Sequence, residues 1–155
     1  MKRENFCKMI RKFQQGDTER VMQIWLEGNI ETHDFIAKDY WVSNYPLVKK
    51  QLSQADIYVY EVDEKIQGFV GMMGDYIAGI FVDKNFRSMG IGTTLLEYIK
   101  GISSSFSLNV YQQNQRAVDF YLREGLLVVS EELDEDTGKI EYTMLWDKNR
   151  EKILI

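Results

Sequence analysis

The first third of the chain combines one strand-like run with two stretches of helical spacing. In residues 8–13 every second side chain falls on one face, which predicts a short strand. Residues 16–29 carry an apolar stripe and predict a helix that Gly28 can end. Residues 31–45 predict a second helix after a loop, and residues 47–55 can extend it. The stripe and N-terminal cap of the first helix are Val21, Ile24, Trp25 and Asp17.

The middle of the chain is rich in β-forming residues. Two such runs within residues 57–74 flank the turn at 63–65, which predicts a hairpin. Residues 76–82 are continuously apolar and predict a further strand, buried on both faces. Residues 91–102 place Ile or Leu at spacings of 4, 4 and 3, which is one helical stripe. That stripe is Ile91, Leu95, Ile99 and Ile102.

The last third returns to strands around one helix. Residues 106–111 alternate strictly and predict a strand, and residues 126–146 predict a closing hairpin. Between them a helix is expected, with Asn114 as its N-cap and Gly125 after its end. The middle order of strand, helix and strand makes a parallel pair joined by a right-handed crossover. The fold class is therefore α/β (α+β), with a mixed, mostly antiparallel sheet flanked by helices.

Two glycines, Gly90 and Gly92, stand where the helix after the apolar strand begins. A helix start has unpaired N–H groups and a partial positive charge, and glycine lets an anion approach its backbone. The N–H groups of residues 89–93 can converge on a pyrophosphate, with Arg87 close by. No lysine completes a Walker pattern, and the dinucleotide fingerprint needs a third glycine. A glycine-rich helix start without any ligand is the alternative.

Composition narrows the class of protein. The 155 residues predict one domain over residues 1–155. A net charge of −5 argues against nucleic acid or an anionic membrane as a partner. Cys7 is the only cysteine, so an internal disulfide is impossible, and no apolar run reaches the ~20 residues of a membrane span. We therefore expect a cytoplasmic protein.

Several segments of the chain resemble a known family. Residues 87–92, Arg-Ser-Met-Gly-Ile-Gly, resemble the Arg/Gln-x-x-Gly-x-Gly/Ala acyl-CoA loop of the GNAT superfamily of N-acetyltransferases. Residues 108–126 resemble its next strand and helix, with Asn-x-x-Ala and Phe-Tyr-x-x-x-Gly in place, and residues 134–145 resemble its closing hairpin. The segment Thr-His-Asp-Phe at 32–35, followed by Tyr-Trp at 40–41, is similar to the YjaB-type bacterial subgroup.

The resemblance implies a splayed parallel strand pair, with the pantetheine arm of acetyl-CoA in the gap and direct transfer to an amine without a metal. Tyr121 would protonate the departing thiolate, although a core aromatic is the alternative for this residue. Asn114 would bond the pantetheine or only cap its helix. The residues expected to bind the cofactor are Ile80, Val82, Arg87, Met89, Gly90, Ile91, Gly92, Thr93 and Asn114.

The general base is less clear from the sequence. Many relatives carry a glutamate on the first splayed strand, but residues 76–82 contain no carboxylate and Asp75 only precedes them. His33, the sole histidine, lies where the family usually forms the acceptor pocket, and its ordinary pKa suits a base. It could instead be exposed, with Asp34 as a helix cap. A water chain that ends at Asp75 is the other candidate.

The function expected from these features is acetyl-CoA-dependent N-acetylation of a small-molecule or peptide amine by a monomer or homodimer. A non-catalytic acyl-CoA sensor of the same fold is the alternative, because the strand carboxylate is missing. A glycine-rich domain without a cofactor is the third possibility. The acceptor stays open, because loops and the first two helices select it.

Overall fold

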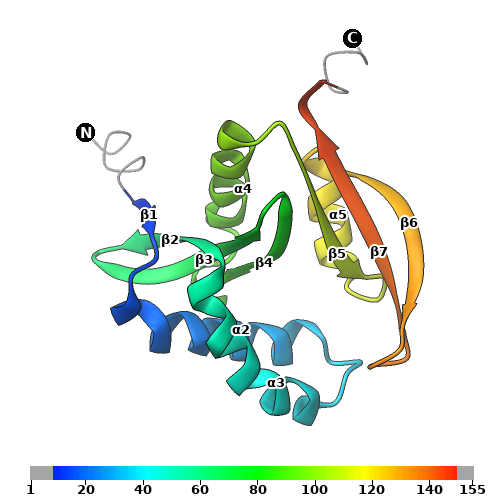
Figure 1. The fold of residues 1–155 in the computed structure, drawn as a ribbon, viewed down its shortest axis with the longest axis horizontal. Coiled ribbons are helices and arrows are strands. Elements are labelled where there is room, and N and C mark those ends of the chain that lie inside the picture. Colours follow the sequence, from blue (N-terminus) through cyan, green and yellow to red (C-terminus); the bar gives the residue numbers. More distant parts are fainter. Residues whose placement is uncertain (1–8, 150–155) are drawn as a thin grey trace.

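The computed structural model describes residues 9–149, so Cys7 lies outside the described range. Within that range one sheet has the strand order β1-β2-β3-β4-β5-β7-β6 (Figure 1). Every neighbouring pair is antiparallel except β4 and β5. The strands are β1 Ile10–Lys12, β2 Asp56–Val62, β3 Lys65–Met73, β4 Tyr76–Val82, β5 Ser105–Tyr111, β6 Leu127–Asp134 and β7 Lys139–Asp147.

The helices cover both faces of this sheet (Figure 1). The larger core packs α4 and α5 against one face, and a smaller core packs α2 against the other. Both cores are made of the apolar positions that the sequence pattern indicates. The helices are α2 Thr18–Thr32, α3 Lys38–Gln51, α4 Ile91–Ile102 and α5 Gln115–Arg123, with single 3-10 turns at η1 Gln15–Asp17, η2 Leu52–Gln54 and η3 Lys84–Phe86.

The parallel pair opens after two residues. Tyr76 and Ile77 pair with Ser107 and Leu108, and beyond these positions β4 and β5 diverge. The right-hand part of the sheet, β5, β7 and β6, therefore stands apart from β2, β3 and β4 (Figure 1). The predicted mixed sheet with a splayed parallel pair is confirmed.

A β-bulge in β4 accompanies this opening. Gly71 pairs with Gly79 while Met72 pairs with Ile77, so Ala78 is an extra residue on β4. A bulge bends its strand and increases the local twist. It therefore turns the end of β4 away from β5 at the position where the pairing stops.

Several local expectations are wrong. Gly28 lies buried inside α2, and a Cβ there would come within 3.1 Å of the Phe81 ring, so this glycine allows close packing rather than ending the helix. The expected helix over residues 31–45 begins only at Lys38. In β4 only Ile77 is fully buried, because the strand lines an open gap. The end of the α4 stripe, Ile102, is 55% exposed.

Candidate active site

A groove of about 600 Å³ passes from the start of α4, through the gap between β4 and β5, to the end of α2. Its lining brings together segments that are far apart in the chain. Of the predicted site residues, the following line it: His33, Ile80, Val82, Arg87, Gly90, Ile91, Gly92, Thr93, Asn114 and Tyr121. Met89 does not line it, and its side chain is 63% exposed.

At one end of the groove the backbone presents the N-terminus of α4. Gly90 is the N-cap and has φ of +82°, a left-handed conformation in which glycine carries no steric penalty. Its carbonyl accepts hydrogen bonds from Thr94, so the helix starts tightly. Among the side chains of residues 9–149 none caps this helix, so its first N–H groups stay available to an anion.

Three arginines add positive charge to this end. Arg87, Arg116 and Arg123 all line the groove. Arg87 is predicted from the sequence to bind the cofactor, and for Arg116 the sequence leaves open a contact with the phosphates or a solvated side chain. Arg87 Nη1 donates to Glu31 Oε1 at 2.7 Å, and its Nε donates to the Val82 carbonyl at 3.2 Å. This end therefore suits a phosphate-bearing ligand. Such a ligand would compete with Glu31 for the guanidinium of Arg87.

The middle of the groove is the gap itself. From Ala78 onward the edge of β4 that faces β5 has no strand partner among residues 9–149. Backbone N–H and C=O groups on such an edge need a partner. Ile80 and Val82 lie on this stretch, so their backbone can pair with the amides of an extended ligand.

Tyr121 reaches the gap from α5. Its side chain is partly buried against the larger core, and its hydroxyl has no hydrogen-bond partner within the described range. Burial raises the pKa of the Tyr121 phenol, and the nearby Tyr76 adds to this rise. The phenol therefore stays protonated at neutral pH and is available as an acid.

His33 ends α2 and is held on both ring nitrogens. Nδ1 lies 3.2 Å from the Asn29 carbonyl, and Nε2 lies 3.3 Å from Nδ2 of Asn114. These partners fit the neutral tautomer that donates from Nδ1 and accepts at Nε2. Burial lowers the pKa of His33, which agrees with a neutral ring. Asn114 Oδ1 in turn accepts from Ala117 N at the start of α5, as predicted for an N-cap.

Aromatic side chains enclose His33 at the far end of the groove. The ring stacks on Trp41 at 5.1 Å and meets Phe35 and Tyr111 edge-on. The Trp41 indole Nε1 is, within residues 9–149, a buried donor without a hydrogen-bond partner. An unsatisfied donor is unusual in a core and typical of a surface that receives a ligand.

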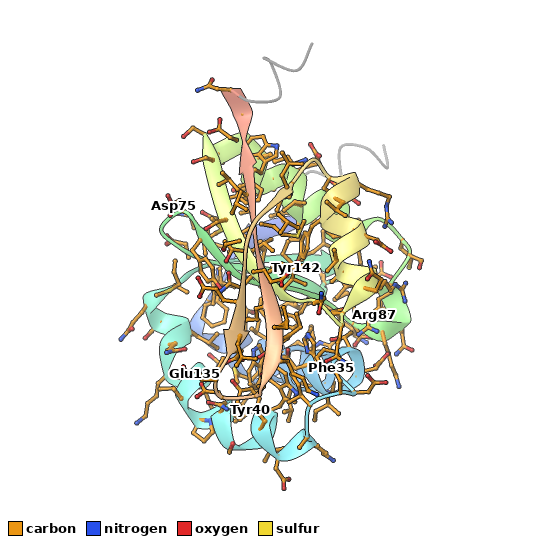
Figure 2. All side chains as sticks on the ribbon, turned by 90° about the vertical axis from the view of Figure 1, so that its right-hand side faces the viewer. Phe35, Tyr40, Asp75, Arg87, Glu135 and Tyr142 are labelled. Atoms are coloured by element: carbon orange, nitrogen blue, oxygen red, sulfur yellow. The ribbon has the colours of Figure 1, made fainter. Side chains whose placement is uncertain are left out.

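Carboxylates border this end as well. Asp134, at the end of β6, accepts a hydrogen bond of 2.6 Å from the Tyr111 hydroxyl. The tip of the β6–β7 hairpin, with Glu135, lies beside Tyr40 at the start of α3 (Figures 1 and 2). Glu141 on β7 lines the groove directly. Glu141 is not among the residues predicted from the sequence, because only the pairing of β7 with β5 brings it to the site. Asp75, in contrast, does not line the groove.

Comparisons with known proteins agree with this geometry. The family model of the acetyltransferase (GNAT) domain matches residues 53–125. The chain is 34% identical over 140 residues to the peptidyl-lysine N-acetyltransferase YiaC of Escherichia coli, covering 89% of this chain and 96% of YiaC. The chain belongs to the GNAT family. The Escherichia coli peptidyl-lysine N-acetyltransferase YjaB is 31% identical over 132 residues, covering 84% of this chain and 89% of YjaB.

A solved structure supports the same placement among the GNAT proteins. The solution structure of the apo form of YjaB from Escherichia coli superposes with a TM-score of 0.79 at 26% identity, covering 88% of this chain and 95% of YjaB. The expected YjaB-type GNAT membership is therefore confirmed. The protein is an acetyl-CoA-dependent N-acetyltransferase that acts on an amine. No helix in the described part of this GNAT chain is long and apolar enough to cross a membrane.

Proposed function

We propose that this GNAT protein transfers the acetyl group of acetyl-CoA to the side-chain amine of a lysine in a peptide or protein. One observation carries the proposal. The groove is cationic at the α4 end, where Arg87, Arg116 and Arg123 lie, and has a carboxylate, Glu141, at the other end. Such a groove suits a phosphate-bearing donor at one end and a cationic amine at the other. The names of the relatives YiaC and YjaB support a peptide lysine as that amine.

The residues of the cationic end fit the phosphates of acetyl-CoA. A left-handed Gly90 followed by Gly92 removes side chains where a large anion would meet the helix N-terminus. The N–H groups of residues 90–93 and the Arg87 guanidinium would hold the pyrophosphate, and the backbone of Ile80 and Val82 would pair with the pantetheine. When bound, acetyl-CoA supplies the activated acetyl group.

The chemistry requires a neutral amine, a donor to the developing oxyanion and an acid for the thiolate. The N–H groups on the open edge of β4 near Ile80 provide the donor. Tyr121 is the acid, because its phenol is protonated and its hydroxyl is unpaired within the described range. We place the reaction in the cytoplasm, since the only cysteine, Cys7, leaves no internal disulfide.

Two roles are considered for His33 in this reaction, that of general base and that of positioning residue. Its role as the general base stays a prediction from the sequence. The contacts favour a positioning role, because the ring holds Asn114, and Asn114 caps the helix that carries Tyr121. In either role the neutral ring is the competent form.

The test is an acceptor screen with the full-length protein. Acetyl-CoA is supplied with N-terminally blocked peptides that contain one lysine, with matched peptides that contain arginine instead, and with a panel of small amines. We expect free thiol to appear with the lysine peptides alone, and mass spectrometry to locate the acetyl group on the lysine. Acetylation of small amines without any acetylation of lysine peptides would overturn the proposed acceptor.

A further inference from the structure

We propose that the carboxylate of Glu141 accepts the proton of the acceptor ammonium and so generates the nucleophilic amine. Glu141 lies on β7, where it pairs with Tyr111 of β5 on one side and with Glu132 of β6 on the other. It is the carboxylate that lines the groove within the described range. The inference rests on amine transfer itself, and it holds whether the acceptor is a peptide lysine or a smaller amine.

The side chain of Glu141 belongs to the acceptor side of the sheet. Directly paired residues of antiparallel strands point to the same face. The next pair on that face, Thr143 and Asn109, shows this by a hydrogen bond of 2.8 Å between their side chains. Tyr111 on the same face meets His33 and Phe35 at the α2 end of the groove. Tyr121 comes from α5, which packs with the larger core on the opposite face.

Glu141 also lies at the same level along the strands as Ile80 of β4. If the parallel register is continued along both strands from the pair Tyr76–Ser107, Tyr111 of β5 falls level with Ile80 of β4. The bulge at Ala78 shifts this correspondence by one residue at most. Glu141 is the register partner of Tyr111, so it stands at that same level. The expected oxyanion donor near Ile80, the acid Tyr121 and the carboxylate of Glu141 therefore surround one section of the groove.

The neighbouring charges suit Glu141 to a proton transfer. Burial first, and then the charges of Asp134 and Glu132, raise the pKa of the Glu141 carboxyl. A more basic carboxylate is a better proton acceptor near neutral pH. The ionisable groups around it, from β4, β5, β6, β7 and α3, are Tyr76, Tyr111, Glu132, Asp134, Lys139 and Tyr40.

Other candidate bases are already engaged. Asp134 accepts hydrogen bonds from Tyr111 and Thr137, whereas no side-chain hydrogen bond holds the Glu141 carboxylate within residues 9–149. Both ring nitrogens of His33 have partners. Glu141 is therefore the carboxylate in the described groove that can take a proton without losing an existing bond.

The acceptor ammonium gives one proton to Glu141, and the nitrogen lone pair then forms a bond to the thioester carbonyl carbon. The carbon–sulfur bond breaks, and the CoA thiolate takes the proton of the Tyr121 hydroxyl. The second nitrogen proton restores the phenol, and Glu141 releases its proton to solvent. The products are the acetylated amine, CoA and one proton.

The test compares Glu141→Gln with Glu131→Gln, a control on the neighbouring strand whose side chain is exposed and whose register partner is Tyr142. The acceptor is the best primary amine of the wild-type screen, assayed beside a fluorinated analogue whose ammonium is a stronger acid. We expect Glu141→Gln to lower kcat/KM by about 10²-fold or more with the ordinary amine, the usual effect of a general base. The loss should shrink by about tenfold with the fluorinated amine, because a larger fraction of this amine is already neutral at the assay pH. Glu131→Gln should change neither value.

Further readouts separate a base from a structural residue. The acid limb of the wild-type pH profile should disappear in Glu141→Gln, while thermal unfolding and CoA affinity by calorimetry stay unchanged. Glu141→Asp, which keeps the carboxylate, should recover part of the rate and the acid limb. Wild-type kcat/KM in a folded Glu141→Gln protein, or an equal loss with both amines, would overturn the inference. These outcomes are independent of whether lysine peptides are the acceptors.

Discussion

The two ends of the groove are built in different ways. The end with the start of α4, the proposed cofactor end, consists mainly of backbone from one continuous segment, the end of β4, the loop after it and the start of α4. The acceptor end consists of side chains from four separate segments, namely His33, Trp41, Tyr111 and Glu141. Backbone N–H groups can hold a phosphate with almost any neighbouring sequence, whereas an acceptor is selected by particular side chains. We therefore expect substitutions at one end to change CoA affinity, and substitutions at the other to change turnover and acceptor choice.

The largest effect is expected where the two ends meet, at Tyr121. Tyr121→Phe removes only the hydroxyl, so kcat should fall by about 10²–10⁴-fold, the usual contribution of general acid catalysis. CoA affinity should stay close to wild type. The control is Tyr142→Phe, because Tyr142 is also partly buried but does not line the groove. A fully active Tyr121→Phe enzyme would leave this tyrosine with a packing role alone.

The next effect isolates the backbone site of the cofactor end. Gly92→Val should weaken CoA binding by about tenfold or more, because the branched side chain enters the groove between α4 and Phe120. Gly101→Val on the same helix is the matched control, since its added Cβ meets nothing within 4 Å. Valine is at least as good a helix former as glycine, so both variants should fold. Equal CoA affinity of the two variants, measured by calorimetry, would remove the phosphate role of the α4 start.

An effect of comparable size concerns charge at the same end. Arg87→Gln should weaken CoA binding by about 10- to 150-fold if the guanidinium makes one charge-assisted bond worth about 1.5–3 kcal/mol. Glu31→Gln frees Arg87 from an ion pair that is partly exposed. Because such pairs contribute about 0–1 kcal/mol, CoA should bind the Glu31→Gln protein up to about fivefold more tightly. Weaker binding by Glu31→Gln would mean that Glu31 orients Arg87 rather than competing for it.

The smallest effect is a dependence of stability on pH at the acceptor end. Burial lowers the pKa of His33 below 6.5, so the unfolded chain takes up a proton before the folded protein does. Stability is therefore lost as pH falls below 6.5, down to the lowered folded-state pKa. His33→Gln removes this dependence of stability on pH. Between pH 7.5 and pH 5 the melting temperature of the variant should therefore fall by a few degrees less than that of wild type. Parallel pH profiles of wild type and variant would contradict a buried, neutral His33.

The start of α4 is the part of the groove whose local geometry is predicted well from the sequence. Gly90, Gly92 and Arg87 stand within a few residues of each other, and their spacing depends only on where one helix begins. The same local logic predicts the N-cap Asn114 and the left-handed Gly125. It fails for Gly28, because the reason for that glycine is the Phe81 ring of a distant strand.

The acceptor end depends on register and on the bulge, which no local pattern contains. In the sequence pattern Glu141 is a polar position of a predicted hairpin, and Trp41 is an apolar position of a predicted helix. Nothing local distinguishes either residue from its neighbours. Only the pairing of β7 with β5 places Glu141 beside Tyr111, and only the packing of α3 stacks Trp41 on His33.

By itself, then, the sequence determines the order of strands and helices, the mixed α+β class and the glycine-rich start of α4, because short-range periodicity and backbone chemistry specify each of these. The splay of the parallel pair is expected only from the resemblance to the GNAT superfamily. The tertiary structure alone decides how far β4 and β5 separate, which partners the two ring nitrogens of His33 contact and which carboxylate faces the gap. Those properties arise from contacts between residues such as His33 and Asn114 or Tyr111 and Glu141, which meet only when the sheet has formed.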